Sequence, residues 1–559
     1  MAHTQSMSAT AAATVGQAFQ ATAAEFAQEP ALRTPGNEVE WSWDDYARDV
    51  RAVAAGLSGL GLRRGDTLAC WLSNRPEFHV ADTAAMHLGA ASFSVYPTYT
   101  AAQAEHVIGD AGARILITEP QFLERALEVR DGGGTNLEPI VVVDDSADAG
   151  ILEWDELPGC ADPAFDFEAQ VAAVRPEYLL TLIYTSGTTG PPKGVQITHR
   201  NVMTLLAAMS ERLQLPDGIR AISWLPMAHV AERLCTHYFP IVHGWRVTTC
   251  PEPKTIAKLI AEVRPEFFFS PPRLWEKLRA GVLAKTGGEV PAGPAAQAAL
   301  EQLGFDALRV AIVGAAPCPP EVIRFWHALG VNLGEVYGMS ETTGVATINP
   351  PDAVRIGTVG PPLPGVEVRL ADSGEVLVRG PNVMPGYRNL PEKTAEAIDP
   401  EGWLHTGDVG AFDHAGYLKI VDRIKEIIIS AAGKNMSPAN IEAVLKTSGR
   451  LIGQACCIGD GRPYNVALIT LDPDAAAAFA TSEGIAAEAV AAHTAVHAAV
   501  ADEVERANEQ LARVEQIRKF TILAEDWVPD GDELTPTMKL KRGPISEKYA
   551  AEIDALYAG

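Results

Sequence analysis

The 559-residue sequence lacks an excess of basic residues, because 45 lysines and arginines stand against 71 aspartates and glutamates, a formal net charge of −26. A nucleic acid or an anionic membrane as the main partner would require a basic face, so the charge argues against both. Uninterrupted apolar runs of about 18 residues, the length of a membrane-spanning helix, are also absent. We therefore expect no membrane span and no nucleic-acid partner, whereas peripheral contact with a membrane stays open.

Cysteine is scarce, with seven residues, and only Cys456 and Cys457 are adjacent. Neither a C-x-x-C pair nor a zinc-ligand spacing occurs, which favours a reduced, cytoplasmic protein. Because Cys456 and Cys457 lie in the apolar run Ile452–Ile458, we interpret them as small core residues. No basic segment followed by an apolar core opens the sequence, so we expect no signal peptide.

The length exceeds what one hydrophobic core supports, so we expect two or more domains. From Trp41 onward, helical patterns alternate with short apolar stretches such as Thr67–Leu72, Ser92–Tyr96 and Ile115–Ile117. This alternation predicts an α/β fold with a largely parallel sheet. The segment Ala280–Leu300, rich in alanine and glycine, predicts a mobile or surface connection.

The stretch Tyr184–Gly194 (YTSGTTGPPKG) follows Leu179–Ile183, which has the pattern of a strand. Three glycines let its backbone turn tightly and approach a ligand. Hydroxyls, backbone N–H groups and one ammonium provide the donors that suit a polyphosphate. The position of the lysine differs from the Walker pattern G-x-x-x-x-G-K-[ST]. The candidate phosphate-binding residues are Thr185, Ser186, Gly187, Thr188, Thr189, Gly190 and Lys193.

Three later stretches carry groups that suit other parts of a nucleotide. A predicted strand, Val310–Val313, runs into the small residues 314–317, which permit the close approach of a flat ring. The stretch 334–344 (GEVYGMSETTG) offers the aromatic face of Tyr337 and the carboxylate of Glu341, a hard oxygen ligand for Mg²⁺. Asp408 ends the stretch 402–408 (GWLHTGD), and its two acceptor oxygens suit a diol.

In sequence and order these stretches resemble the motifs of the adenylate-forming superfamily, which contains acyl-CoA synthetases, firefly luciferase and peptide-synthetase adenylation domains. Phe267–Lys277 and Asp532–Arg542 are similar to stretches of long-chain fatty acyl-CoA synthetases, and Gly386–Arg388 belongs to a further motif that we interpret as structural. The resemblance covers nearly the whole chain. It implies a large N-terminal domain of stacked α/β sheets, residues 1–422, and a small mobile α+β C-terminal domain, residues 423–559.

The resemblance also implies roles for single residues. Lys539 would be the catalytic lysine, with Lys541 as its rival, and His229 would line the pocket for the substrate carboxylate. The polar stretch Asp422–Lys425, between the predicted strands 417–421 and 426–430, would be an exposed hinge centred on Lys425. The loop with Gly433 and Lys434 would line the CoA channel.

The implied nucleotide site combines several stretches. Thr185 and Glu341 would hold Mg²⁺, while Asp408 and Arg423 would contact the ribose. The superfamily more often has a second glycine where this chain has Ala315. Besides the phosphate loop, the site would contain Gly314, Ala315, Ala316, Pro317, Glu335, Val336, Tyr337, Gly338, Met339, Ser340, Asp408, Ile420 and Arg423.

The implied reaction uses ATP, Mg²⁺ and CoA as co-substrates, without a prosthetic group. A medium- to long-chain fatty acid attacks the α-phosphate of ATP, and CoA then attacks the resulting acyl-adenylate. Catalysis would rest on positioning and electrostatics, because the substrate itself supplies the nucleophile. The alternatives are an acyl-AMP ligase that loads a carrier protein, an aryl- or other carboxylate–CoA ligase, and a silent acyl-nucleotide binding protein. A monomer and a homodimer both stay open.

Overall fold

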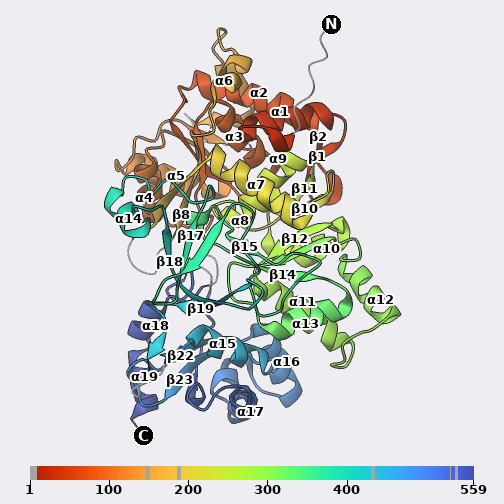
Figure 1. Cartoon of the computed structure of the whole chain (residues 1–559), viewed down its shortest axis with the longest axis vertical. Helices are drawn as coiled ribbons and strands as arrows, with labels where there is room; N and C mark the ends of the chain where they lie inside the picture. The colour runs from red at the N-terminus through yellow and green to blue at the C-terminus, as the bar shows by residue number, and fades with distance from the viewer. Residues whose placement is uncertain are drawn as a thin grey trace. The chain divides into compact units, whose positions relative to one another are not determined.

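The computed structural model describes residues 9–144, 151–185, 191–429, 435–528, 531–535 and 539–558, and Figure 1 shows its helices and strands. Two compact units are present. The larger unit contains the residues up to Ala315 together with Ile323–Val368 and Val378–His405. The smaller unit contains Ala316–Val322, Arg369–Leu377 and the chain from Thr406 onward. The fold is mixed α/β, with a large N-terminal and a smaller C-terminal part, as the sequence predicted.

A seven-stranded sheet with the order β7-β6-β5-β3-β4-β8-β9 organises the first part of the larger unit. All neighbouring strands pair in parallel except β8 and β9, which are antiparallel. Parallel pairing requires crossover helices, which explains the alternation of patterns in the sequence. The strands are β3 (Thr67–Trp71), β4 (Ala91–Ser94), β5 (Ile115–Thr118), β6 (Ile140–Val142), β7 (Leu152–Glu153), β8 (Leu179–Thr185) and β9 (Lys193–Thr198).

Helices α1, α2 and α3 pack together beside this sheet (Figure 1). Helix α7 begins with Thr198 as its N-cap: the Thr198 hydroxyl accepts from the Asn201 N–H, which completes a capping box. The helices of this region are η1 (Ala9–Ala11), α1 (Val15–Glu25), η2 (Pro35–Asn37), α2 (Trp43–Gly59), α3 (Pro76–His87), α4 (Ala101–Ala111), α5 (Pro120–Asp131), η3 (Trp154–Cys160), α6 (Phe167–Ala173) and α7 (His199–Leu213).

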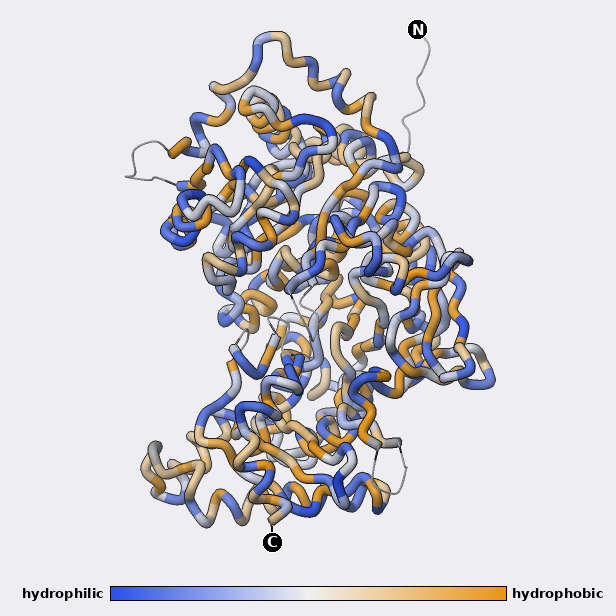
Figure 2. Tube along the Cα trace, turned by 90° about the vertical axis from the view of Figure 1, so that its left-hand side faces the viewer, coloured by the Kyte–Doolittle hydropathy of each residue, from blue (hydrophilic) through white to orange (hydrophobic). Residues whose placement is uncertain are grey.

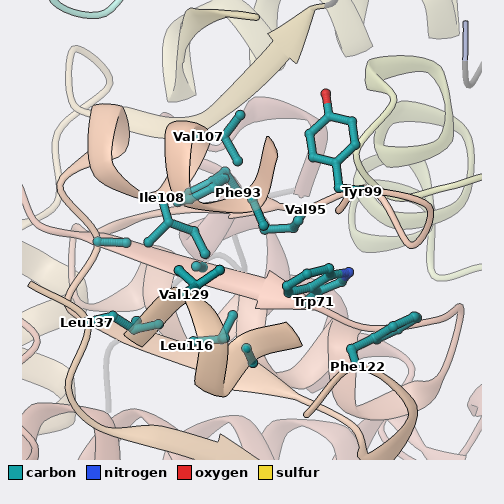
Figure 3. Packing of buried hydrophobic residues seen from close by; sticks show 14 of the residues in the cluster. Trp71, Phe93, Val95, Tyr99, Val107, Ile108, Leu116, Phe122, Val129 and Leu137 are labelled. Atoms are coloured by element: carbon teal, nitrogen blue, oxygen red, sulfur yellow. The ribbon is translucent and has the colours of Figure 1, made fainter. Parts of the chain in front are cut away.

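One face of the seven-stranded sheet forms a core with α4 and α5 (Figure 3). Trp71 on β3 stacks on Phe122 of α5, with ring centroids 5.7 Å apart, and the guanidinium of Arg125 lies over the Trp71 ring. Every residue of β3 is buried, so both faces of the sheet are covered, as parallel sheets require. Each large apolar side chain buried here contributes about 1.5–3 kcal/mol.

Two four-stranded sheets follow, with the orders β10-β11-β1-β2 and β12-β13-β14-β15. Their strands are β1 (Pro30–Arg33), β2 (Glu40–Ser42), β10 (Arg220–Ser223), β11 (Arg246–Thr249), β12 (Phe267–Ser270), β13 (Val310–Val313), β14 (Leu333–Tyr337) and β15 (Thr347–Ile348). The helices are α8 (Val230–Arg233), the π-helical turn η4 (Leu234–Tyr238), α9 (Phe239–His243), η5 (Pro253–Thr255), α10 (Ile256–Val263), α11 (Pro272–Lys285), α12 (Pro294–Leu303), α13 (Pro320–Leu329), η6 (Ser340–Thr342) and α14 (Pro391–Ala397).

The segment Ala280–Leu300 is mostly exposed, as predicted for a surface connection, but most of it is helical. Helix α11 extends to Lys285, and α12 begins at Pro294. Alanine is the strongest helix former, and α12 has proline at its first position and the left-handed Gly304 as its C-cap. The alanine-rich segment that we interpreted as a connection therefore forms parts of two helices.

The remaining strands form a sheet of order β16-β17-β18-β19, a β20-β21 pair and a sheet of order β22-β23-β24. Helices α15 and α17 pack on the last sheet through Ile441, Leu445, Val496 and Val500. The strands are β16 (Glu367–Leu370), β17 (Glu375–Arg379), β18 (Leu404–Phe412), β19 (Leu418–Arg423), β20 (Ile428–Ile429), β21 (Asn435–Met436), β22 (Ile452–Ile458), β23 (Asn465–Leu471) and β24 (Ile517–Ile522). The helices are α15 (Pro438–Thr447), α16 (Pro473–Glu483), η7 (Ala487–Ala492), α17 (Thr494–Gln510), α18 (Arg542–Lys548) and α19 (Ala550–Tyr557).

Six of the seven cysteines are buried, and Cys160 is half-buried. Burial raises the pKa of the Cys456 thiol to about 12. Among the residues that the structure describes, no helix is both long and apolar enough to cross a membrane. Polar and apolar residues instead alternate in short blocks along the chain (Figure 2).

Candidate active site

The predicted phosphate loop connects the two antiparallel strands at the edge of the seven-stranded sheet. Thr185, the last residue of β8, lies opposite Lys193, the first residue of β9, and Tyr184 lies opposite Gly194. This pairing holds the two ends of the connection together. A Cβ atom at position 194 would lie 3.1 Å from the Tyr184 ring, so the close approach of the strands favours glycine there. Ser186, Gly187, Thr188, Thr189 and Gly190 lie outside the described residues.

Glu341 lies on the short helix η6, which contacts strand β9. Its carboxylate is 6% exposed, and its Oε1 accepts a hydrogen bond of 2.7 Å from the Tyr387 hydroxyl. The Lys193 ammonium lies 4.1 Å from the centroid of the Tyr387 ring. The structure thus brings two predicted site residues, Lys193 and Glu341, to one tyrosine. The sequence analysis did not select Tyr387, because a Gly-Tyr-Arg triplet carries no chemical signal of its own.

The predicted adenine-binding residues follow β13 and lie on β14. A Cβ atom at Gly314 would lie 2.5 Å from Val336 Cγ1, and one at Gly338 would lie 2.3 Å from the Gly344 carbonyl oxygen. Both positions therefore require glycine. Ala315 has φ +65°, in the left-handed region that favours glycine, which explains the superfamily's preference at this position.

The rest of this stretch is fixed by backbone contacts. The carbonyl of the buried Glu335 accepts from the Asn349 N–H at 3.1 Å. The Met339 N–H donates to the Thr342 hydroxyl at 3.0 Å. Of the remaining candidates here, Ala316, Tyr337 and Ser340 are half-buried and Pro317 is exposed.

Asp408 and Arg423, the predicted ribose contacts, lie opposite each other on β18 and β19. Arg423 Nε is 3.1 Å from Asp408 Oδ1. The aspartate side chain is 8% exposed, whereas the arginine side chain is 45% exposed. Ile420, on the same strand, lies opposite Gly410 and is half-buried. The structure therefore places the three residues on one antiparallel pair of strands.

The predicted exposed hinge, Asp422–Lys425, was wrong for Asp422. This residue belongs to β19 and is buried, and its Oδ2 accepts from the Ser437 hydroxyl at 2.5 Å and from the Ala439 N–H at 3.3 Å. A buried carboxylate with these donors is a structural anchor. Lys425 is exposed in the turn that follows the strand. Gly433 and Lys434, the predicted CoA-channel residues, lie outside the described residues.

His229 ends the loop Ser223–His229 and caps helix α8, where its Nδ1 accepts from the Ala231 N–H at 3.2 Å. Buried Glu232 anchors the other end of this loop: its Oε1 accepts from the Trp224 N–H at 2.9 Å, and also from the Thr236 hydroxyl at 2.6 Å. Burial raises the pKa of Glu232 to about 7, although these hydrogen bonds lower it in part.

Arg233, which has no exposed surface, anchors the middle of the same loop. Its Nε donates to the Met227 carbonyl at 3.0 Å, and its Nη1 forms a salt bridge with buried Asp82. His237 Nε2 lies 2.9 Å from the second oxygen of Asp82. Burial by itself would raise the pKa of Asp82, but Arg233 and His237 hold it well below its ordinary value. The loop that carries His229 is thus attached to a buried ionic network.

Two hydrogen bonds join Thr535 and Lys539: the Thr535 N–H donates to the Lys539 carbonyl at 2.8 Å, and the Lys539 N–H donates to the Thr535 hydroxyl at 3.0 Å. Lys539 is exposed. Lys541, its rival, donates from Nζ to the Gly531 carbonyl at 2.9 Å. Arg542 follows and makes a two-pronged salt bridge with the buried Glu442 on α15, at 2.7 and 2.8 Å.

No group of three or more histidine, cysteine, aspartate or glutamate side chains that could hold a metal ion occurs in the described part of the chain. Mg²⁺ that accompanies a nucleotide is usually held by one or two carboxylates together with phosphates and water. A buried carboxylate at Glu341 and a hydroxyl at Thr185 are oxygen donors of this kind. The side chains present therefore fit a nucleotide-bound Mg²⁺ better than an ion held by protein alone.

Comparison with known proteins supports the resemblance seen in the sequence. Residues 19–388 match the AMP-binding enzyme family, and residues 425–559 match the AMP-binding enzyme C-terminal domain. The chain is 46% identical, over 434 residues, to the fatty-acid–CoA ligase fadD11 of Mycobacterium tuberculosis, covering 70% of this chain and 76% of that protein. It is 33% identical, over 566 residues, to the long-chain-fatty-acid–CoA ligase FadD15 of the same organism, covering 93% of each.

Solved structures with low sequence identity share the fold. The anthranilate CoA ligase AuaEII, in complex with anthranoyl-AMP, is 21% identical, with a TM-score of 0.79, over 98% of this chain and 100% of that chain. The o-succinylbenzoate CoA synthetase MenE of Bacillus subtilis, with its acyl-adenylate intermediate, is 22% identical, with a TM-score of 0.73, over 94% of this chain and 97% of that chain. The predicted fold and family are confirmed, and the chain belongs to the AMP-binding enzyme family, with fatty-acid–CoA ligases among its relatives.

Proposed function

We propose that this chain is an ATP-dependent fatty acyl-CoA synthetase that acts on medium- to long-chain acids. The observation that carries the proposal is the 46% identity to a chain named as a fatty-acid–CoA ligase. The family supports ATP and CoA as substrates. In the first step the acid's carboxylate oxygen attacks the α-phosphate and pyrophosphate leaves; in the second, the CoA thiolate attacks the acyl carbon and AMP leaves.

Most of the residues proposed to bind the nucleotide phosphates and the adenine belong to the larger unit. The N–H groups and hydroxyls of residues 185–190, with Lys193, would bind the β- and γ-phosphates. The residues 314–317 and 335–340 would take the adenine, with Tyr337 offering its ring. Mg²⁺ would neutralise phosphate charge when bound, and Glu341 and Thr185 would hold it. His229, held by its anchored loop, would line the pocket for the acyl carboxylate.

The smaller unit would supply the ribose contacts and the catalytic lysine. We assign the C-terminal domain to residues 423–559, with Lys425 as its hinge and Gly433 and Lys434 in the CoA channel. Asp408 would accept hydrogen bonds from the ribose hydroxyls, and Arg423, paired with it, would fix the orientation of the carboxylate. Attack of one anion on another needs positive charge between them, and Lys539 would provide it by bridging the carboxylate and the α-phosphate.

Pyrophosphate release by the purified protein tests the proposal. Acetate, octanoate, oleate, benzoate and cinnamate would each be supplied with ATP and Mg²⁺, with and without CoA. The expected result is CoA-dependent turnover on octanoate or oleate, which also measures the preferred chain length. Adenylate formation that CoA does not accelerate would replace the proposal with a carrier-protein ligase. Turnover on benzoate or cinnamate alone would indicate an aryl–CoA ligase, and no turnover at all a silent nucleotide-binding protein.

A further inference from the structure

We propose that Tyr387 is a positioning residue for the Mg²⁺–ATP complex, a role that rests on the proposed function. Its hydroxyl would fix the orientation of the Glu341 carboxylate, and its ring would fix the Lys193 ammonium. One side chain thereby connects the proposed metal ligand with the proposed phosphate-binding lysine.

Two contacts of Tyr387 support this inference. The Tyr387 hydroxyl donates to Glu341 Oε1 at 2.7 Å, and Lys193 Nζ lies 4.1 Å from the ring centroid. Both partners are charged, and they meet different parts of the tyrosine, the hydroxyl and the face of the ring. A hydrogen bond to an ionised acceptor is stronger than a neutral one and fixes its direction. A cation over an aromatic face is held by the ring's quadrupole.

The backbone around Tyr387 is itself attached to both elements. The Arg388 N–H donates to the Gly194 carbonyl at 2.7 Å and the Gln196 N–H to the Gly386 carbonyl at 3.1 Å, so this segment runs along β9. The Met384 N–H donates to the Glu341 carbonyl at 2.9 Å. The segment 384–388 therefore joins the strand that leaves the phosphate loop to the turn that carries Glu341, with Tyr387 between these attachments.

The Tyr387 hydroxyl is hydrogen-bonded to one oxygen of the Glu341 carboxylate, so it also fixes the direction in which the second oxygen points. Groups that hydrogen-bond to a metal ligand tune its orientation, and their loss typically costs about 10- to 100-fold in metal affinity or activity. A tyrosine that only filled space would show no such dependence on Mg²⁺. The response to Mg²⁺ concentration therefore separates positioning from simple packing.

Tyr387→Phe is the direct test, because it removes the hydroxyl and keeps the ring. The full-length protein would be titrated with MgCl₂ at fixed ATP while the rise in melting temperature and the rate of pyrophosphate release are recorded. For Tyr387→Phe we expect the Mg²⁺ concentration at half-maximal stabilisation to rise about 10-fold. The stabilisation by ATP without Mg²⁺ should stay as in the wild type.

The matched control is Tyr46→Phe, which removes a fully buried hydroxyl that contacts the His79 carbonyl at 2.9 Å and the Thr83 hydroxyl at 2.7 Å. This variant should lose stability without changing the Mg²⁺ response. Tyr387→Leu removes the ring as well, so it should also weaken stabilisation by ATP in the absence of Mg²⁺, through Lys193.

A wild-type Mg²⁺ response in Tyr387→Phe overturns the role of the hydroxyl, whatever its melting temperature. ATP stabilisation in Tyr387→Leu that equals that of Tyr387→Phe overturns the role of the ring. If the wild type responds to Mg²⁺ and ATP but releases no pyrophosphate with any acid, the proposed function fails, while the titration still decides the role of Tyr387. A wild type that Mg²⁺ and ATP do not stabilise overturns both.

Discussion

The loop that ends at His229 and the segment around Lys539 differ in how they are attached to the protein. The first is held by two buried ionisable side chains, Glu232 and Arg233, which bind its backbone at Trp224 and Met227. Lys539 itself is exposed, and its backbone N–H and carbonyl form hydrogen bonds with the nearby Thr535. Three residues further on, Arg542 forms a salt bridge with the buried Glu442.

The difference matches the tasks that we propose for the two segments. A pocket that selects an acyl group needs a wall with one fixed geometry, and a buried ionic network provides it because every alternative leaves a charge unpaired. A lysine proposed to act in one of two steps needs access to its substrate, which exposure provides. Substitutions of the side chains that anchor the loop should therefore affect stability. Substitutions of Lys539 should affect only the rate of the reaction.

The largest effect is expected from Arg233→Met, which leaves Asp82 buried without its guanidinium partner. Breaking one side of a buried pair costs about 3–5 kcal/mol, so denaturant unfolding should show a loss of this size. Arg48→Met, which removes a largely exposed ion pair, should cost less than about 1 kcal/mol. Adding Asp82→Asn to Arg233→Met should restore part of the stability. An Arg233→Met protein as stable as Arg48→Met would contradict the anchoring of the loop.

Lys539→Ala should leave stability unchanged and lower the rate of acyl-adenylate formation by about 10²–10³, equivalent to roughly 3–4 kcal/mol. The reaction of a supplied acyl-adenylate with CoA should stay near the wild-type rate. Lys446→Ala, on helix α15, serves as the control for loss of a lysine from the same unit. An equal loss in both half-reactions, or a larger loss in Lys541→Ala, would reject Lys539 as the catalytic lysine.

Glu232 predicts a pH dependence of stability in the loop. In the unfolded chain its carboxyl ionises near the ordinary pKa of 4.5, whereas burial raises the pKa to about 7 in the folded protein. The unfolded state thus releases the proton first, and the free energy of unfolding should fall by about 3 kcal/mol as pH rises from 5 to 8. Glu232→Gln keeps an acceptor oxygen for Trp224 and Thr236 and should remove this contribution.

The measurement is denaturant unfolding at both pH values for the wild type and Glu232→Gln, with the exposed Glu301→Gln as the control. Only the difference between variants reports on Glu232, because other groups titrate in the same range. A pH dependence in Glu232→Gln that matches that of the control would show that this carboxyl does not carry the effect.

The smallest effect is expected at Ala315, in the stretch that follows strand β13. Ala315 has φ +65°, a conformation that costs an L-residue about 1–2 kcal/mol. Ala315→Gly should therefore raise the free energy of unfolding by about 1 kcal/mol, after the entropic cost of glycine. Ala316→Gly, whose φ is not positive, should lower it instead. Thermal unfolding of the two variants checks the sign, and equal shifts would contradict strain at Ala315.

The sequence predicted structural features that depend on residues close together in the chain. The strand Val310–Val313 has the predicted bounds, because a short apolar run is a local signal. The unpredicted helical part of Ala280–Leu300 also has local signals: Pro294 and Gly304 mark the ends of a helix, and these signals were overlooked.

Contacts between distant residues could not be predicted in this way. Tyr387 is 46 residues from Glu341, and Arg233 is 151 residues from Asp82. Asp422 looked like an exposed linker residue because its partners, Ser437 and Ala439, belong to a later segment. A single sequence shows which residue types suit a reaction, but their pairing depends on how the chain folds.

The burial of the thiols has a practical consequence for all of these measurements. A thiol-specific reagent should modify at most about one cysteine of the folded protein, Cys160, but all seven once the chain unfolds. Buried thiols with raised pKa values stay protonated and react slowly. The same reagent can therefore follow the consumption of free CoA during turnover with little background from the enzyme. Additional modified cysteines in a variant would report its unfolding in the same assay.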